Sequence, residues 1–382
     1  MKKTAIQFKD EPPTFIKISG RLLMSIKFSF AAYEDKEEWN AVVDESTYSE
    51  IYHTYEWTQL LEKTYNIKVF RLVARINSSI IGILPFIYLP NLIFGPKIIS
   101  LPFSDIGGPL TRDKNNNISK RLTKELIKIA TKWKTRFIEI RSLQENAEYL
   151  PSLNFISPLQ AFTYRLDTTK PYTEIWSNYS KKIRHNIKKM KSLGLKIKEA
   201  TDESAISTYH TIYLKRMKNF GTPPAPLSFW HNMWKTFQPK GQMKLIFTIL
   251  DNKEIAGFTA LLFKRKLYFT LNVSLREFWK YYGLNELLFD WYIKHACENQ
   301  YEMVDFGRAR KGTGVQRFKE KGWGTNPIPL NTYCFFLHRR MKNPLETALQ
   351  TDNIYAKAWK KFIPTTITPI LGYLLRKNLG DI

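Results

Sequence analysis

One order of structural elements occurs twice in this sequence, and it limits the possible folds more than any other feature. In each half, the apolar periodicity predicts two strands joined by a short polar turn, then a third strand, a loop, an amphipathic helix and a last strand. In the first half these segments are 69–76, 80–88, 97–101, 102–110, a helix that includes 122–133, and 136–141. In the second half they are 244–250, 255–263, 267–273, 274–283, a helix that includes 284–291, and 301–306. The period far exceeds that of a solenoid repeat, so we expect two consecutive α/β units.

The repeat divides the chain into four parts. We expect a leader over 1–24, a first unit over 25–168, a second unit over 169–340 and a basic amphipathic tail over 341–382. The boundary between the two units is placed where Pro171 interrupts the pattern.

Composition supports a folded, strongly basic protein. The 382 residues are 43% hydrophobic and 14% aromatic, which is enough for a sizeable core, and the formal net charge is +25. Such a charge favours polyanions as partners, whether nucleic acid, anionic lipid or a phosphorylated substrate. Cys297 and Cys334 have no metal-ligand or redox spacing, which suits a reducing cytoplasm and indicates no metal site. The most apolar run, 80–95, is too short for a transmembrane helix and contains two prolines.

The predicted strand 301–306 runs into a loop rich in glycine and cations. Asp305 lies near the end of the strand, and three glycines follow within nine residues. The cations of this segment are Arg308, Arg310, Lys311, Arg317, Lys319 and Lys321. We expect an active-site edge here, which would hold phosphates or a developing oxyanion. The alternative is a solvated basic loop.

Two further basic segments carry no acidic residue. Segment 176–191 has an apolar helical face, and its other faces hold Lys181, Lys182, Arg184, Lys188, Lys189 and Lys191. Like charges one helical turn apart repel, so this helix is expected to have an anionic neighbour, or else to be a solvated lysine-rich surface. In the tail, the amphipathic stretches 356–362 and 370–379 would either dock on the core or lie on an anionic membrane surface.

Four segments, taken together in their order, resemble a known family. They are PFSDIGGPL at 102–110, W-x-x-Y-S-K-K-I-R-x-x-I-K-K at 176–189, YGLNELLFDW at 282–291, and DFGRARKGTG followed by FKEKGWG within 305–324. They resemble the FemAB-like group, which comprises FemA, FemB, FemX and exopolysaccharide-associated relatives, over roughly residues 25–340. The resemblance implies an α/β fold of two tandem GNAT-like modules, each a mixed, mostly antiparallel sheet with flanking helices.

The resemblance also implies a function. FemAB-like proteins are acyltransferases, so the chain would move an aminoacyl or acyl group to an amine of a cell-envelope or polysaccharide precursor. The donor would be an anionic cosubstrate, aminoacyl-tRNA or acyl-CoA, with no tightly bound cofactor and no metal. Two alternatives stay open: an acyl-CoA-dependent N-acetyltransferase of a small amine, and a non-catalytic binder of nucleic acid or anionic surfaces. The expected location is the cytoplasm, with peripheral contact to the inner face of the membrane as a further possibility.

The family's Phe-Lys pair is matched by Phe318 and Lys319, and the resemblance implies that this lysine contacts the donor or stabilises the oxyanion. Asp305 is expected to orient or deprotonate the acceptor amine. The further candidates for substrate binding are Arg308, Arg184, Tyr282, Asn285, Arg317 and Arg216. Segment 280–285, KYYGLN, keeps one glycine and a cation of the GNAT pyrophosphate loop but lacks the small final residue. The CoA alternative therefore has less support from the residues.

Overall fold

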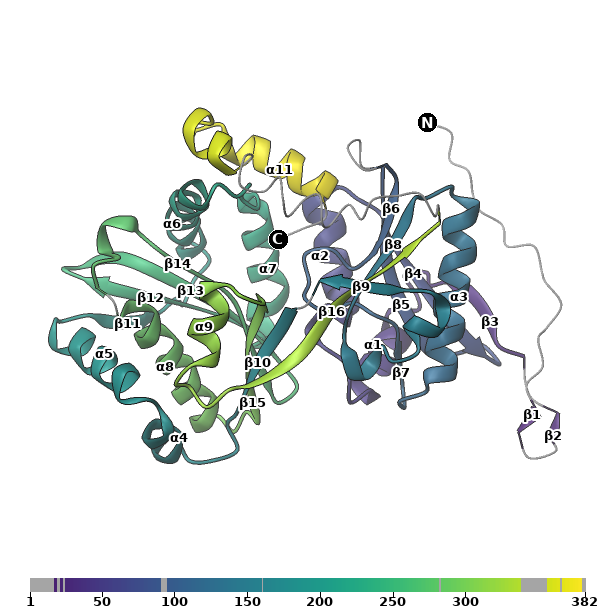
Figure 1. The fold of residues 1–382 in the computed structure, drawn as a ribbon, viewed down its shortest axis with the longest axis horizontal. Coiled ribbons are helices and arrows are strands. Elements are labelled where there is room, and N and C mark those ends of the chain that lie inside the picture. The colour runs from purple at the N-terminus through teal and green to yellow at the C-terminus, as the bar shows by residue number, and fades with distance from the viewer. Residues whose placement is uncertain are drawn as a thin grey trace.

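The computed structural model describes residues 17–18, 21–22, 25–90, 95–159, 161–281, 283–337, 356–364 and 366–379. Within these ranges, 14 strands form one mixed sheet that runs the length of the molecule (Figure 1). Twelve of the strands follow one another in the order β11-β12-β13-β14-β15-β10-β16-β8-β6-β5-β4-β3. Most neighbours are antiparallel, and the two parallel pairs are β6 with β8 and β14 with β15.

The first half of the chain builds one end of this sheet. Its strands are β3 (Lys27–Phe30), β4 (Val69–Ile76), β5 (Ser79–Leu89), β6 (Lys97–Ser100), β7 (Leu110–Thr111), β8 (Phe137–Leu143), β9 (Ile156–Leu159) and β10 (Ala161–Asp167), the last of which crosses to the other end. Its helices are α1 (Lys36–Glu45), η1 (Ile51–His53), α2 (Tyr55–Tyr65), α3 (Asn116–Lys132), η2 (Gln144–Asn146) and η3 (Leu150–Leu153). The predicted hairpin, third strand, helix and last strand are all present in this order.

The second half repeats the order at the other end. Its strands are β11 (Lys196–Glu199), β12 (Met243–Leu250), β13 (Lys253–Phe263), β14 (Lys266–Ser274), β15 (Met303–Arg310) and β16 (Asn326–Phe336). Its helices are α4 (Tyr172–Asn178), α5 (Lys181–Ser192), α6 (Ala205–Phe220), α7 (Leu227–Phe237), η4 (Gln238–Lys240), η5 (Arg276–Phe278), α8 (Leu284–Glu298), α9 (Gly314–Glu320) and α11 (Thr368–Leu379).

Two strands join the halves by crossing between them. β10, which ends just before residue 168, lies between β15 and β16, and β16 lies between β10 and β8. β16 pairs with β10 through 326–329 and with β8 through 330–336. Because β10 of the first half pairs with β15 and β16 of the second, and β16 also pairs with β8 of the first, the sheet has no break at the junction. The division at 168 thus stays a proposal about the repeat.

A shared aromatic core also holds the halves together. The ring centroid of Trp57 on α2 lies 6.4 Å from that of Phe229 and 6.1 Å from that of Phe237, both of which are on α7. Tyr65 at the end of α2 stacks 4.3 Å from Phe103. These rings belong to one buried cluster that draws residues from both halves. Burying such large apolar side chains opposes separation of the two units.

Two sequence predictions of local structure need correction. The single basic helix expected over 176–190 is two helices, because the chain leaves α4 at Tyr179 and Ser180 restarts α5 by accepting a hydrogen bond from the Ile183 amide. The loop expected after Phe306 is partly regular, since β15 continues to Arg310 and α9 follows.

The two ends of the chain are only partly described. In the leader, β1 (Lys17–Ile18) pairs with β2 (Arg21–Leu22), while the rest of 1–24 and residues 341–355 lie outside the described residues. The described tail, a helix at 356–362 and α11, lies across the ends of α6 and α7 (Figure 1). None of the helices in the described ranges has the length and apolar character that a membrane crossing requires.

Candidate active site

The candidate site forms where β14 and β15 diverge. These parallel strands pair from Lys266 with Met303 to Tyr268 with Asp305, and both continue beyond that last pair. Gly307 follows at once with a φ of +73°, a backbone conformation that is natural for glycine and costly for other residues. The divergence leaves the carbonyls of β15 available to another partner.

Lys319 is that partner. Its ammonium donates hydrogen bonds to the carbonyls of Gly307 and Arg308, each at 3.0 Å. Consecutive carbonyls of a regular strand point to opposite edges, so the unusual backbone at Gly307 lets both converge on one nitrogen. An ammonium has three donors, which leaves one for a ligand. Burial lowers the pKa of Lys319 to about 8, although Asp105 and Asp305 act in the opposite direction.

Phe318 fixes the helix that carries Lys319. Its ring packs edge-on 5.1 Å from Phe289 of α8 and lies 5.9 Å from Trp323. Thr313 caps α9 by accepting a hydrogen bond from the Gln316 amide at 3.1 Å. Phe318 is therefore an apolar anchor, and Lys319 faces the divergence while its neighbour holds the helix.

The loop between β6 and β7 brings Asp105 to the same place from the first half. Leu101 and Phe103 both have positive φ, at 53° and 58°, and such backbone conformations in non-glycine residues cluster at functional sites. Gly107 donates to the Arg141 carbonyl at 3.0 Å, and a Cβ there would approach the Ser100 carbonyl oxygen to 2.5 Å. This rigid loop fixes the position of Asp105. Among the described residues, no hydrogen-bond donor contacts the Asp105 carboxylate.

Asp105 and Lys319 flank one small space. A Cβ built on Gly307 would lie 3.6 Å from the Lys319 Nζ and 3.7 Å from an Asp105 carboxylate oxygen. A pocket opens here, and its walls come from both halves and from both crossing strands. Its lining residues are Tyr52, Asp105, Ile106, Thr163, Tyr268, Phe269, Asp305, Gly307 and Leu330.

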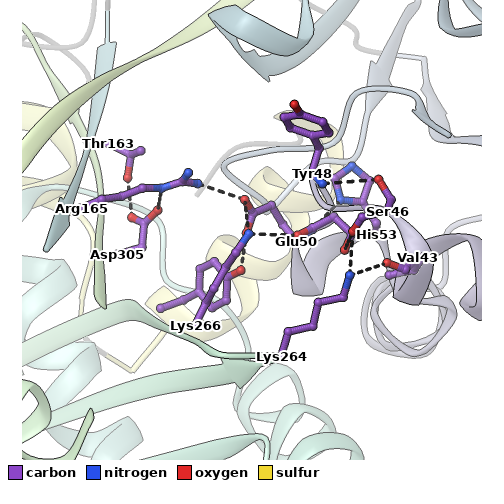
Figure 2. A network of polar contacts seen from close by, with 12 residues as sticks. Val43, Ser46, Tyr48, Glu50, His53, Thr163, Arg165, Lys264, Lys266 and Asp305 are labelled. Carbon is purple, nitrogen blue, oxygen red and sulfur yellow. Dashed lines mark hydrogen bonds and ion pairs between the residues drawn. The ribbon is translucent and has the colours of Figure 1, made fainter. Parts of the chain in front are cut away.

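Beside the pocket, Asp305 is held in a buried network (Figure 2). Its carboxylate accepts hydrogen bonds from the Thr163 hydroxyl, from Arg165 Nε at 3.0 Å and from the Gly307 amide at 2.8 Å. The third of these bonds helps to set the backbone turn at Gly307. With three donors engaged, this carboxylate is suited to positioning, and less to accepting a proton from a substrate.

Glu50 extends the network into the first half. Although only 1% exposed, it accepts hydrogen bonds from Arg165 Nη2 at 3.0 Å, from the Tyr268 hydroxyl and from Lys266 at 3.5 Å. Arg165 thus bridges one buried carboxylate from each half, as Figure 2 shows. A buried charge needs such partners, because an unpaired one is strongly destabilising.

His53 supports Glu50 through a fixed tautomer. Its Nδ1 accepts a hydrogen bond from the Glu50 amide at 3.1 Å, so Nε2 carries the proton and donates to the Gly108 carbonyl at 3.2 Å. Burial lowers the pKa of His53 to about 4, so the ring is neutral at physiological pH. It joins η1 to the loop that carries Asp105.

We expect Thr163→Val to destabilise the protein by about 2 kcal/mol, because it removes one hydrogen-bond donor from a buried carboxylate at nearly constant volume. Denaturant unfolding monitored by intrinsic fluorescence measures the difference. Thr211→Val is the matched control, since Thr211 is exposed on α6 and donates only to the Ser207 carbonyl at 3.0 Å. Equal stability of the two variants would show that the Thr163 hydroxyl does not support Asp305.

The other predicted site residues lie at several places. Arg308 donates to the Thr332 hydroxyl at 3.0 Å, Arg184 donates to the Ser177 carbonyl, and Arg317 is exposed on α9. Asn285, at the start of α8, accepts a hydrogen bond from Asn272 of β14 at 3.0 Å. Their roles as substrate contacts stay predictions.

Arg216 and Tyr282 complete that set. The Arg216 guanidinium stacks between two rings, 3.9 Å from the centroid of Phe220 and 4.2 Å from that of Trp279. This contact gives it a packing role on α6, and substrate binding by it stays a prediction. Tyr282 lies outside the described residues.

A second pocket adjoins the first through Ile106, which lines both. It lies in the first half, between the end of α1, the loop after Ile106 and the start of α3. Its walls are mainly polar and include Tyr48, His53, Lys114, Asn115, Ser142 and Asn146. Within the described ranges, no cluster of three or more His, Cys, Asp or Glu residues is suited to hold a metal ion.

The sequence and the fold are similar to those of known proteins. Residues 177–320 match the family described as the acetyltransferase (GNAT) domain. A crystal structure of FemX superposes with a TM-score of 0.63 at 14% identity, covering 85% of this chain and 100% of that one. The chain has the tandem GNAT fold of FemAB-like proteins. The fold and the resemblance predicted from the sequence are therefore confirmed.

Two other solved structures widen the comparison. A tandem GNAT protein from the clavulanic acid biosynthesis pathway has a TM-score of 0.53 at 11% identity, covering 83% of this chain and 100% of that one. L-PGS from Bacillus licheniformis has a TM-score of 0.54 at 12% identity, covering 83% of this chain and 96% of that one. No curated protein matches the sequence. At these identities the tandem GNAT fold is shared, and the substrates have to be inferred from the site.

Proposed function

We propose that this chain is an acyltransferase that joins an aminoacyl or acyl group to an amine of a cell-envelope or polysaccharide precursor. The observation that carries the proposal is that the Lys319 ammonium and the Asp105 carboxylate lie 3.6 and 3.7 Å from the position that a Cβ of Gly307 would take. Asp105 belongs to the first half of the chain and Lys319 to the second. Acyl transfer to an amine needs a base for the amine and a cation for the developing oxyanion, and this pair supplies both.

The reaction would proceed through a tetrahedral intermediate. The acceptor amine passes a proton to Asp105 as its nitrogen attacks the donor carbonyl, and the remaining N–H of Lys319 stabilises the oxyanion. The bond between the carbonyl carbon and the donor's oxygen or sulfur then breaks, and the new C–N bond remains. Asp105 returns the proton to that leaving group, so the enzyme ends unchanged. Asp305 acts as a positioning residue through the Gly307 amide.

The structure around α8 favours an aminoacyl-tRNA donor over acyl-CoA. In the CoA alternative, pyrophosphate would lie at the start of this helix. Here α5 covers that start, since a Cβ on Gly283 would come within 2.6 Å of the Asn186 carbonyl oxygen, and Asn186 donates to Glu286 in the first turn at 2.9 Å. A carboxylate in the first turn also opposes a second anion. The cations of α5 and α9 instead offer a surface for a long polyanion.

The neighbouring polar pocket gives the acceptor a place within this proposal. Ile106 lines both pockets, so an acceptor bound in the polar pocket would lie close to Asp105, the residue before Ile106. We place the protein in the cytoplasm, where both proposed cosubstrates occur, in peripheral contact with the inner face of the membrane. The two cysteines are free thiols, in keeping with a reducing compartment.

Thermal shift assays test the choice of donor. Aminoacyl-tRNA should raise the melting temperature of the protein, whereas a CoA thioester should leave it unchanged. Uncharged tRNA is the control for general attraction to polyanions. Stabilisation by the CoA thioester alone would overturn the aminoacyl donor in favour of an N-acetyltransferase, and binding of both tRNAs without any transfer would favour the non-catalytic alternative.

Gly307→Ala should lower turnover roughly tenfold to a hundredfold, because the methyl group enters the space between Asp105 and Lys319 and shifts the strand. The positive φ alone costs about 1–3 kcal/mol of stability. Gly312→Ala is the matched control, since Gly312 also has a positive φ, of +83°, and a Cβ there meets nothing within 4 Å. If both variants lose turnover equally, the space at Gly307 is not the reaction site.

A further inference from the structure

The C-terminal helix α11 is docked with its polar face inward. Thr368, Gly372 and Arg376, spaced one turn apart, are its buried positions, and Arg376 is only 5% exposed. Arg376 Nε donates to the Pro223 carbonyl at 2.7 Å, and a Cβ on Gly372 would come within 2.4 Å of the Pro224 carbonyl oxygen. The helix therefore lies tightly on the 221–226 loop through its small and polar side.

Two further contacts hold this tail in place. The Tyr373 hydroxyl donates to the Tyr65 carbonyl at 3.2 Å, and their rings stack 6.0 Å apart. In the preceding helix, Trp359 is buried and Lys218 of α6 donates to its carbonyl at 2.8 Å. The docking that the sequence left open is thus observed. It leaves Ile370 and Leu374 of α11 exposed.

The outward face is apolar instead. Phe362 is 68% exposed and Ile370 is 66% exposed, and the other exposed large apolar side chains of the tail are Ile367, Leu374 and Leu375. Ile367, Ile370 and Leu374 follow the spacing of a single helical stripe. A soluble surface rarely gathers apolar side chains in this way unless another surface covers them.

The charge of the tail indicates what kind of surface would cover its exposed apolar side chains. Residues 356–379 contain no acidic residue, and besides the buried Arg376 they carry the lysines Lys357, Lys360, Lys361 and Lys377, none of which is buried. Lysines beside an apolar stripe are typical of helices that lie in the headgroup region of an anionic bilayer. A second copy of this chain would bring the same cations into contact and adds another +25 charges, so like-charge repulsion opposes it. We propose that the exposed apolar side chains Phe362, Ile367, Ile370 and Leu374 of the tail bind an anionic membrane surface while the opposite side of α11 stays docked.

Vesicle sedimentation of the full chain tests this assignment. Wild-type protein should sediment with vesicles of phosphatidylcholine containing 30 mol% phosphatidylglycerol at about 0.1 M salt, and remain in solution with phosphatidylcholine alone. Ile370→Glu should weaken binding to the anionic vesicles at least about tenfold. It replaces an apolar side chain that the bilayer would bury with a carboxylate of the same charge sign as the lipid. Thermal unfolding of the variant should match that of the wild type, since the side chain points outward.

Ile156→Glu is the matched control, because Ile156 is 53% exposed on β9 and gives the same change of charge. Equal loss of vesicle binding in the two variants would mean that net charge alone drives adsorption, and would overturn the proposal. Light scattering without lipid provides a second check. A dimer that Ile370→Glu dissociates would show that a second copy covers this face, and would also overturn it. Neither result depends on acyl transfer.

Discussion

Lys319→Ala should lower turnover about a thousandfold while leaving a folded protein. The substitution removes the cation that faces the developing oxyanion, and loss of one such group typically costs about a hundredfold to a thousandfold in rate. It also frees the carbonyls of Gly307 and Arg308, so the strand loses the ammonium that joins them. Turnover is measured as the mass added to an amine acceptor, and circular dichroism checks the fold.

Lys321→Ala is the control for this substitution. Lys321 is exposed just beyond α9, so its loss removes the same charge without touching the divergence of β14 and β15. It should weaken polyanion binding slightly and leave turnover near the wild-type value. If Lys319→Ala turned over normally and lost only polyanion binding, Lys319 would belong to the basic rim and not to the reaction centre.

Lys319 should also make turnover fall at alkaline pH. Because burial lowers the pKa of Lys319 to about 8, its positive charge is present below that pH and is lost as the pH rises through it. Wild-type turnover should therefore fall above pH 8, and the residual activity of Lys319→Ala should lack this limb.

Asp105→Asn should lower turnover by a comparable factor, about a hundredfold to a thousandfold. The amide keeps the size of the side chain but cannot take a proton from the acceptor amine, and general-base catalysis contributes about that much. The defect should lie mainly in kcat, because donor binding does not use this carboxylate. Single-turnover rates with saturating donor separate the two effects.

Asp113→Asn is the control for Asp105→Asn, since Asp113 is an exposed carboxylate in the same half. Comparing Asp105→Asn with Asp305→Asn shows which of the two carboxylates acts as the base and which positions the backbone. Asp305→Asn should also lower stability, because its three donors lose a charged acceptor. A normal rate for Asp105→Asn with a lost rate for stable Asp305→Asn would return the base to Asp305.

Sequence patterns predicted the local elements well where periodicity was strong. The limits of β4 agree with the predicted segment 69–76, and the order of hairpin, strand, helix and strand recurs as expected. Phe318 and Lys319 are in one place with Asp305 because α9 folds back on β15. These features depend on short stretches of chain, and local preferences determine them.

The network across the junction was beyond sequence reasoning. Arg165 lies on β10, and its alternating stretch AFTYRLD gives no sign that the strand pairs with β15 of the other half. Glu50 precedes a single helical turn that has no recognisable pattern. The available signal was Asp105 itself, an acid just before two glycines in the quoted PFSDIGGPL segment. Only the crossing of β10 and β16 shows that it meets Lys319.

The central claim is that acyl transfer takes place between Asp105 and Lys319 at the junction of the two halves. Its most direct test is mass spectrometry of amine-bearing envelope precursors incubated with the protein and a pool of aminoacyl-tRNAs, in parallel with the Lys319→Ala, Asp105→Asn and Lys321→Ala variants. We expect one acyl increment on the precursor with wild type and Lys321→Ala, and a loss of about a hundredfold or more with the other two. Equal yields from all four proteins would contradict the claim.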